Sequence, residues 1–249
     1  MIETAQRPKI YNSSRHFYLL HLVIPAAAAS LILWVIYILG IDERITRLFF
    51  NPETRRFPLR DNWFLETVMH HWIKYAVILL GLSVLVAYVS SFWVAMLAPL
   101  RRVLVFVVLA MALSTATVNL LKNESPKHCP YDLKIFGGYA PYVALFEKTP
   151  RGVKSGNCWP GAHSTAGFCL MALYFAGRHL RNRKLANWGL FGGLGLGFIL
   201  GFGRVMQGAH FFSHQLWAAL ICWLVMLAVY ELLLRRHSVP EKEAAFQPG

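Results

Sequence analysis

The chain has 249 residues, of which 56% are hydrophobic and only 15% are Asp, Glu, Lys or Arg. Because a soluble domain carries about 25% charged residues, this composition excludes an ordinary soluble globular protein. The formal net charge of +13 comes from basic residues scattered between apolar blocks, so we expect no nucleic-acid partner. Binding to anionic lipids and to a phosphorylated ligand explains the excess of basic residues better.

The apolar residues form blocks of about 20 residues, the length that a helix needs to cross a hydrocarbon core of about 30 Å. We therefore predict an all-α integral membrane protein, a six-transmembrane-helix bundle that forms a single polytopic domain over residues 1–249. The spans are predicted at residues 17–41, 75–100, 103–121, 159–177, 185–203 and 210–234.

The connections between these spans predict the orientation of the bundle. Residues 42–73 contain several Phe and Trp residues, which favours a segment lying in the membrane interface. Arg101-Arg102 is interpreted as a very short connection, and residues 178–184 as a dense basic one. Both lie on the side of the two termini, so the positive-inside rule predicts cytoplasmic termini and long outer loops.

The fifth predicted span carries a glycine at every fourth position. These residues are Gly189, Gly193, Gly197 and Gly201. The spacing places them along one helix face, where a neighbouring backbone can approach closely. We interpret the stripe as a packing feature and not a catalytic one.

Four ionisable residues, Lys122, His163, Arg204 and His210, lie at the outer ends of the third to sixth predicted spans. Ionisable residues placed at random would be divided between the two membrane faces. The apolar segment after His210 also predicts a helix on which His210 and His214 share one face. Imidazoles beside a guanidinium suit an anionic substrate, so we predict an outward-facing active site.

Three motifs resemble those of the type 2 phosphatidic acid phosphatase family, whose patterns are K-x6-R-P, P-S-G-H and S-R-x5-H-x3-D. The corresponding residues are Lys122 with Cys129-Pro130, then Pro160-Gly161-Ala162-His163, then Gly203-Arg204 with His210 and His214. The resemblance covers roughly residues 100–234, the expected catalytic core, and includes the spacing between the motifs.

The resemblance implies a metal-independent phosphohydrolase that needs no cofactor and works through a phosphohistidine. His210 would be the nucleophile, with its other ring nitrogen held by His214. His163 would be the general acid that protonates the leaving oxygen. Lys122 and Arg204 would neutralise the phosphoryl oxygens in the transition state.

One departure from the family's patterns concerns the phosphate-binding cations. Cys129 stands where motif one has arginine, so one cation is missing. Lys127, Arg151 or Lys154 would replace it, and the sequence leaves the choice between them open.

The other departures concern hydrogen bonds. Gly161 and Gly203 stand where the family has serines, which leaves backbone N–H groups near Gly161 as phosphate donors. His214 replaces the aspartate that orients the nucleophile, and a neutral histidine brings no fixed negative charge. The H-F-x-S-H run and the paired cysteines resemble those of bacterial members, so we expect a variant subfamily in a bacterial inner membrane, with the site on the periplasmic side.

Cys129 and Cys158 flank motifs one and two in a predicted outer loop, a compartment in which disulfides persist. We predict a disulfide that tethers the two motifs, the alternative being two unpaired thiols.

Other functions stay open at this point. A zinc-dependent membrane hydrolase would take its ligands from His128, His163, His210, His214 and the loop cysteines, but there is no H-E-x-x-H motif. An anion transporter would place its polar groups at the membrane midplane and not at the span ends. Phosphotransfer from one lipid to another is a third alternative.

An outer, membrane-level site fits a membrane lipid phosphate or diphosphate as the substrate. Undecaprenyl diphosphate, lipid A, phosphatidylglycerophosphate and phosphatidic acid all stay open, because no residue in the three motifs reads the lipid part.

Overall fold

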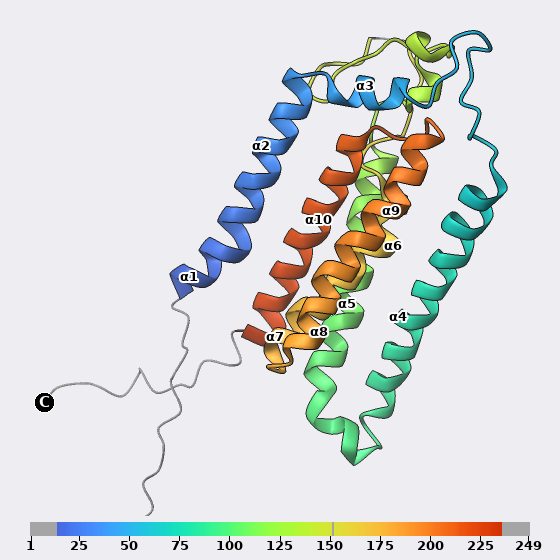
Figure 1. Cartoon of the computed structure of the whole chain (residues 1–249). Coiled ribbons are helices and arrows are strands. Elements are labelled where there is room, and N and C mark those ends of the chain that lie inside the picture. Colours follow the sequence, from blue (N-terminus) through green and yellow to red (C-terminus); the bar gives the residue numbers. More distant parts are fainter. Residues whose placement is uncertain (1–13, 151, 236–249) are drawn as a thin grey trace, which may run out of the picture.

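The computed structural model describes residues 14–150 and 152–235, and that part of the chain is helical apart from loops and two isolated β-bridges. The first span is continuous, from α1 (Ser14–Tyr18) through a π-helical turn into α2 (Ile24–Ile38). The short helix α3 (Ile41–Arg47) then lies across one end of the bundle (Figure 1).

The remaining helices run back and forth between the two ends of the molecule. A π-helical stretch (Phe64–Trp72) continues into α4 (Ile73–Ser90), and a 3-10 turn (Ala95–Leu100) continues into α5 (Arg101–Asn123). After a long loop come α6 (Thr165–Phe168) and α7 (Ala172–His179), each preceded by a 3-10 turn. The described part of the chain closes with α8 (Arg183–Asn187), a π-helical turn (Trp188–Gly192), α9 (Gly193–Met206) and α10 (Phe212–Tyr230), which a last π-helical turn extends to Arg235.

Five helices in the described part of the chain are long and apolar enough to cross a membrane. They are Ser14–Ile38, Phe64–Ser90, Ala95–Asn123, Arg183–Met206 and Phe212–Arg235. The prediction of an all-helical membrane protein is therefore confirmed, whereas the count of six spans is not. The predicted fourth span becomes the series from Ala162 to His179, which begins with His163, Ser164 and Thr165 and is therefore less apolar.

The predicted boundary between the second and third spans is wrong. α4 ends at Ser90, so the connection lies at residues 91–94 and not at Arg101-Arg102. Pro99 lies inside the 3-10 turn Ala95–Leu100, two residues before α5 begins at Arg101. Arg101 donates from Nε to Ser91 Oγ (3.1 Å) and from Nη2 to Ser91 O (2.5 Å), which ties the turn together.

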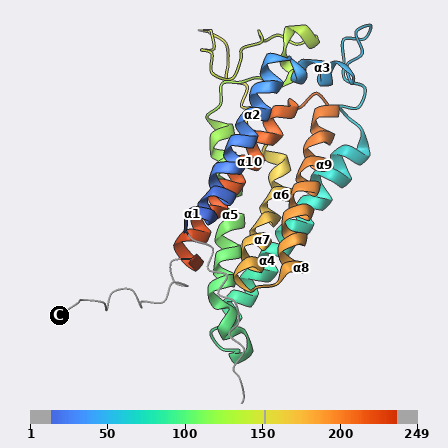
Figure 2. The same cartoon turned by 60° about the vertical axis from the view of Figure 1, so that its left-hand side comes forward.

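The hydrophobic core lies between α5, α6, α7 and α10, where Phe106, Phe168, Phe175 and Met226 are fully buried. α4 has no buried residue and stands at the edge of the bundle, beside α5 and α9 (Figures 1 and 2). The helix α4 therefore forms one side of the molecule and buries little of its surface in the hydrophobic core.

The glycine stripe on α9 packs against α6 and α7, as predicted. A β-carbon on Gly197 would lie 2.1 Å from the Phe168 ring, and one on Gly189 would lie 2.3 Å from the backbone nitrogen of Tyr174. The two backbones approach too closely for any larger residue. This contact fixes the segment that follows His163.

Two loops form a cap over the end of the bundle at which α9 meets α10. The rings of Phe57 from the first loop and Phe136 from the second are in tilted contact at 5.6 Å between centroids, with Phe50 at 5.3 Å from both. Phe211, next to the predicted nucleophile His210, joins the same small apolar cluster. The cap thus covers the helix ends that carry the predicted site.

Candidate active site

Three helix ends bring the predicted catalytic histidines together. His163 lies in the 3-10 turn before α6, His210 in the turn between α9 and α10, and His214 in the first turn of α10. The ring centroids of His163 and His210 are 5.9 Å apart, and the Nδ1 atoms of His210 and His214 are 3.4 Å apart. His210 precedes the helix, so the prediction that both histidines share one helix face is wrong, although their rings still meet.

The turn that carries His210 depends on Gly208. This residue has φ of +68°, a left-handed conformation that favours glycine, and a β-carbon there would lie 2.5 Å from the Phe57 ring. The backbone N–H of Ala209 then donates to Arg204 O at 2.9 Å. The short turn therefore returns the chain so that His210 lies close to Arg204 in the fold.

Asp42 on α3 holds the beginning of α10 in place. Its carboxylate accepts hydrogen bonds from the backbone N–H of Ser213 (2.8 Å) and from Ser213 Oγ (2.5 Å). The side chain of Phe211, the N-cap residue of α10, makes no such bond. The helix is thus capped from a distant part of the sequence, immediately beside His214.

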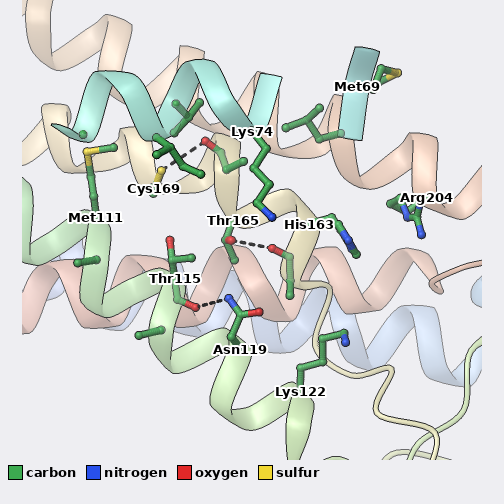
Figure 3. A pocket seen from close by; sticks show the side chains of 18 of the residues that line it. Met69, Lys74, Met111, Thr115, Asn119, Lys122, His163, Thr165, Cys169 and Arg204 are labelled. Carbon is green, nitrogen blue, oxygen red and sulfur yellow. Dashed lines mark hydrogen bonds between the residues drawn. The ribbon is translucent and has the colours of Figure 1, made fainter. Parts of the chain in front are cut away.

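A cavity of about 620 Å³ lies between α4 and the helices α5, α6 and α9 (Figure 3). Lys122, His163 and Arg204 line one end of it, and its other end is lined by apolar side chains such as Leu85 and Met111. His210 is only 2% exposed and lies behind this lining. Two predicted cations and the predicted acid therefore share one cavity.

Arg204 is held by two residues that the sequence did not single out. Its Nη1 donates to Glu66 Oε2 and to Gln207 Oε1, both at 2.8 Å. Gln207 Nε2 donates in turn to Arg60 O at 2.9 Å. Glu66 precedes α4, and a carboxylate in a long apolar stretch was the one available signal for such a role.

The structure joins Cys129 and Cys158 by a disulfide, with their Cα atoms 5.2 Å apart. Cys158 Sγ lies 3.5 Å from His210 Nδ1 and 3.1 Å from Ala209 O. The bridge therefore packs directly against the predicted nucleophile, besides linking the loop segments next to Lys122 and His163.

We expect Cys129→Ser to lower stability by about 3 kcal/mol, because the bridge closes a long loop in the unfolded chain. This corresponds to a fall of roughly 6–12 °C in the unfolding midpoint of a chain of this size. Thermal unfolding in detergent, with and without a reducing agent, measures the difference. A reductant should shift the wild type and leave Cys129→Ser unchanged, and an equal shift in both would contradict the prediction.

The donor atoms near the site do not form a zinc centre. Among the described residues, one set brings three potential metal ligands within 4.8 Å of one another, and it consists of Cys129, Cys158 and His210. Its two sulfur atoms are joined in the disulfide, whereas zinc binds the thiolate form of cysteine. The zinc alternative therefore has no ligand set here.

Comparison with known proteins agrees with this geometry. The family model of the PAP2 superfamily matches residues 103–238, more than half of the chain. The chain belongs to the PAP2 superfamily. No curated protein and no solved structure matches it.

Membership of the PAP2 superfamily indicates a phosphatase, and the apolar helices indicate a membrane protein. The matched residues contain all three motifs and the histidine cluster. They begin after α4, so α2, α3, α4, Asp42 and Glu66 lie outside the match. Of the site residues that sequence reasoning missed, Asp42 and Glu66 thus come from outside the PAP2 region, whereas Gln207 lies within it.

The proposed replacements for the motif-one arginine do not line this cavity. Lys127 donates from Nζ to Ala144 O and Glu147 O, both at 2.7 Å, and lines a second cavity beside α2. Lys154 is exposed in the long loop. Arg151 lies outside the described residues. Among those residues, then, Lys127 and Lys154 do not stand in for the arginine of the PAP2 pattern.

The glycine in PAP2 motif two lies against the end of the Gln215 side chain. A β-carbon on Gly161 would lie 2.4 Å from Oε1 of Gln215, so a serine there would require that side chain to shift. The backbone N–H of Gly161 donates to His214 O at 3.0 Å and is therefore not directed at a phosphate, contrary to the prediction. Gly161 instead connects motif two to motif three through the backbone.

Burial holds the pKa of His210 well below its ordinary value, and the nearby positive charges of His214, His163, Arg204 and Lys122 lower it further. A neutral imidazole keeps a lone pair, which a nucleophile needs. The surroundings of His210 therefore favour its neutral form.

Proposed function

We propose that the chain is an integral membrane phosphatase that hydrolyses a phosphate monoester or diphosphate of a membrane lipid through a phosphohistidine on His210. The observation that supports this most directly is the cavity itself. It combines an apolar body beside a membrane-spanning helix with Lys122, His163 and Arg204 at one end. A lipid fits such a cavity with its chain among apolar side chains and its phosphate among the cations.

The proposed reaction uses each residue of this end in one role. Nδ1 of His210 is already in contact with His214 and the disulfide, which leaves Nε2 to attack phosphorus in line. Lys122 and Arg204 neutralise the phosphoryl oxygens, and His163 protonates the leaving oxygen. Water then hydrolyses the phosphohistidine, no metal takes part, and the enzyme returns to its starting state.

His214 holds the nucleophile in place of the aspartate of the PAP2 pattern. Its Nδ1 atom faces that of His210 at 3.4 Å, so one ring can donate to the other. This contact fixes the tautomer of His210 without adding a negative charge.

We further propose that the protein spans a bacterial inner membrane six times, with the series Ala162–His179 as the remaining crossing and the site on the periplasmic side. Reporter fusions after Lys184 should then give a cytoplasmic signal, and fusions at residues 130–150 a periplasmic one. The dense basic connection at 178–184 supports this orientation. Signals from the opposite compartments would separate Lys122 from the periplasm and overturn the proposal.

The proposed function is tested with purified protein in detergent and the four lipids that fit it: undecaprenyl diphosphate, lipid A, phosphatidylglycerophosphate and phosphatidic acid. Inorganic phosphate should be released from at least one of them, persist in EDTA and fall with vanadate, which mimics the transferring phosphoryl group. If no inorganic phosphate were released from any of these lipids, the proposal of a phosphatase would be contradicted. Disappearance of the substrate only when a second lipid alcohol is present would identify a phosphotransferase instead.

The depressed pKa of His210 predicts the pH dependence of kcat/KM. A histidine nucleophile is active when neutral, so a lowered pKa extends activity toward acid. We expect the acidic limb of His210 to lie below about pH 6.5, the ordinary histidine value. The second pKa of a phosphate monoester, about 6, is measured in the same micelles by ³¹P NMR so that its contribution can be separated. An enzyme limb at or above pH 6.5 would contradict the prediction.

A further inference from the structure

The membrane-spanning stretch Phe64–Ser90 contains two residues of the acidic and basic types, Glu66 and Lys74. A charged side chain within such a stretch is costly, so each calls for a partner. Glu66 has one, because its carboxylate pairs with Arg204 at 2.8 Å. No ion pair joins Lys74 to any residue in the described part of the chain.

The ammonium of Lys74 instead points into the cavity (Figure 3). Lys74 follows Glu66 by eight residues, which places it about 12 Å further along the helix. In the view of Figure 3, its amine lies beyond His163 as seen from Arg204, toward the apolar end of the cavity.

Polar groups from two other helices line the cavity at the level of Lys74. Asn119 on α5 and Thr165 on α6 both line the cavity. In Figure 3, Thr165 is drawn beside the Lys74 amine and Asn119 below it. Thr165 Oγ1 donates to Ala162 O at 2.6 Å, and Asn119 Nδ2 donates to Thr115 O at 2.9 Å. Beyond this layer the lining becomes apolar, with Leu82, Leu85 and Val108.

The cavity thus presents its groups in a fixed order. Arg204 comes first, His163 and Lys122 next, Lys74 third, and the apolar walls last. A lipid monophosphate has one anionic group for the first two cations and none for Lys74. A lipid diphosphate has a second phosphate between the reacting phosphorus and the chain, at the level of the third cation.

We infer that Lys74 binds the lipid-proximal phosphate of a diphosphate substrate, so that the enzyme selects lipid diphosphates over monophosphates. This inference rests on the proposed function. His210 attacks the terminal phosphorus, the bond from that phosphorus to the bridging oxygen breaks, and the oxygen leaves with the lipid monophosphate and takes a proton from His163. Lys74 neutralises the charge that develops on that leaving phosphate. Water then releases inorganic phosphate from His210.

The test uses the full chain in detergent with a matched pair of substrates, a polyprenyl diphosphate and the monophosphate of the same polyprenol. The wild type should have the higher kcat/KM for the diphosphate, and ³¹P NMR should show the lipid monophosphate accumulating. Lys74→Met should lower kcat/KM for the diphosphate at least tenfold more than for the monophosphate. Lys74→Arg should restore most of this selectivity, because it keeps the charge.

Lys148→Met serves as the matched control, since Lys148 is an exposed loop lysine away from the cavity. Replacing Lys74 removes a charge from an apolar helix, so folding is not at risk, and gel filtration in detergent verifies this. An unchanged selectivity ratio in Lys74→Met would overturn the inference while leaving the phosphatase intact. Hydrolysis of neither substrate by the wild type would also overturn the inference, and it would overturn the proposed function only if none of the four lipids named above released phosphate either.

Discussion

His210→Ala is expected to abolish turnover, with kcat reduced by roughly four orders of magnitude or more, as for the loss of a covalent nucleophile in other enzymes. The imidazole is almost fully buried and lies between His163 and His214, and alanine at this position removes the ring that the proposed mechanism uses to attack phosphorus. A lipid phosphate radiolabelled at phosphorus should give rapid, acid-labile labelling of the wild type and none of the variant.

His179→Ala provides the matched control for this experiment. His179 ends α7, at the far end of the bundle from the cavity (Figure 1), so its loss should leave labelling and turnover close to the wild-type values. Persistent labelling or turnover in His210→Ala would show that another residue is the nucleophile.

His163→Ala is expected to have the second largest effect, and the size of the effect should depend on the leaving group. General acid catalysis contributes about 10²–10⁴-fold, and it matters most when the leaving oxygen is strongly basic. An alkyl lipid phosphate should therefore lose this full factor. A nitrophenyl phosphate should lose roughly tenfold or less, because its leaving oxygen departs without protonation.

The comparison of the two substrates contains its own control, since damage to the fold or to the cations would lower both rates alike. His163 lines the cavity beside Lys122 and Arg204, on a different helix from His210, and this is the placement that an acid on the leaving-group side requires. Equal losses for the alkyl and aryl phosphates would assign His163 to binding and not to proton transfer.

The sequence alone was sufficient to predict the site residues that lie at characteristic spacings in short motifs. Lys122, His163, Arg204, His210 and His214 lie in short motifs next to apolar blocks, and the structure brings all five to one end of the bundle. The glycine stripe could also be predicted from the sequence, because glycine recurs there at every fourth position, close to the period of a helix.

What the sequence did not reveal depends on contacts between distant segments. Glu66 and Arg204 are 138 residues apart in the chain, and Asp42 and Ser213 are 171 apart, so no local pattern relates them. The helix boundary at residues 91–94 was missed for a similar reason. Hydropathy continues across the turn, and the reversal of the chain is marked by hydrogen bonds such as that from Arg101 to Ser91.

Because of the placement of α4, the residues around the cavity come from two separate stretches of the sequence. The proposed catalytic residues lie within residues 103–238, whereas the wall that faces the cavity from the other side, with Lys74 and Glu66, comes from residues 64–90. α4 has no buried residue of its own and meets the core only through partly buried side chains such as Val77 and Val84. Under the proposed function, exchange of its cavity-facing side chains would alter the preference for one lipid over another while the reaction stays the same.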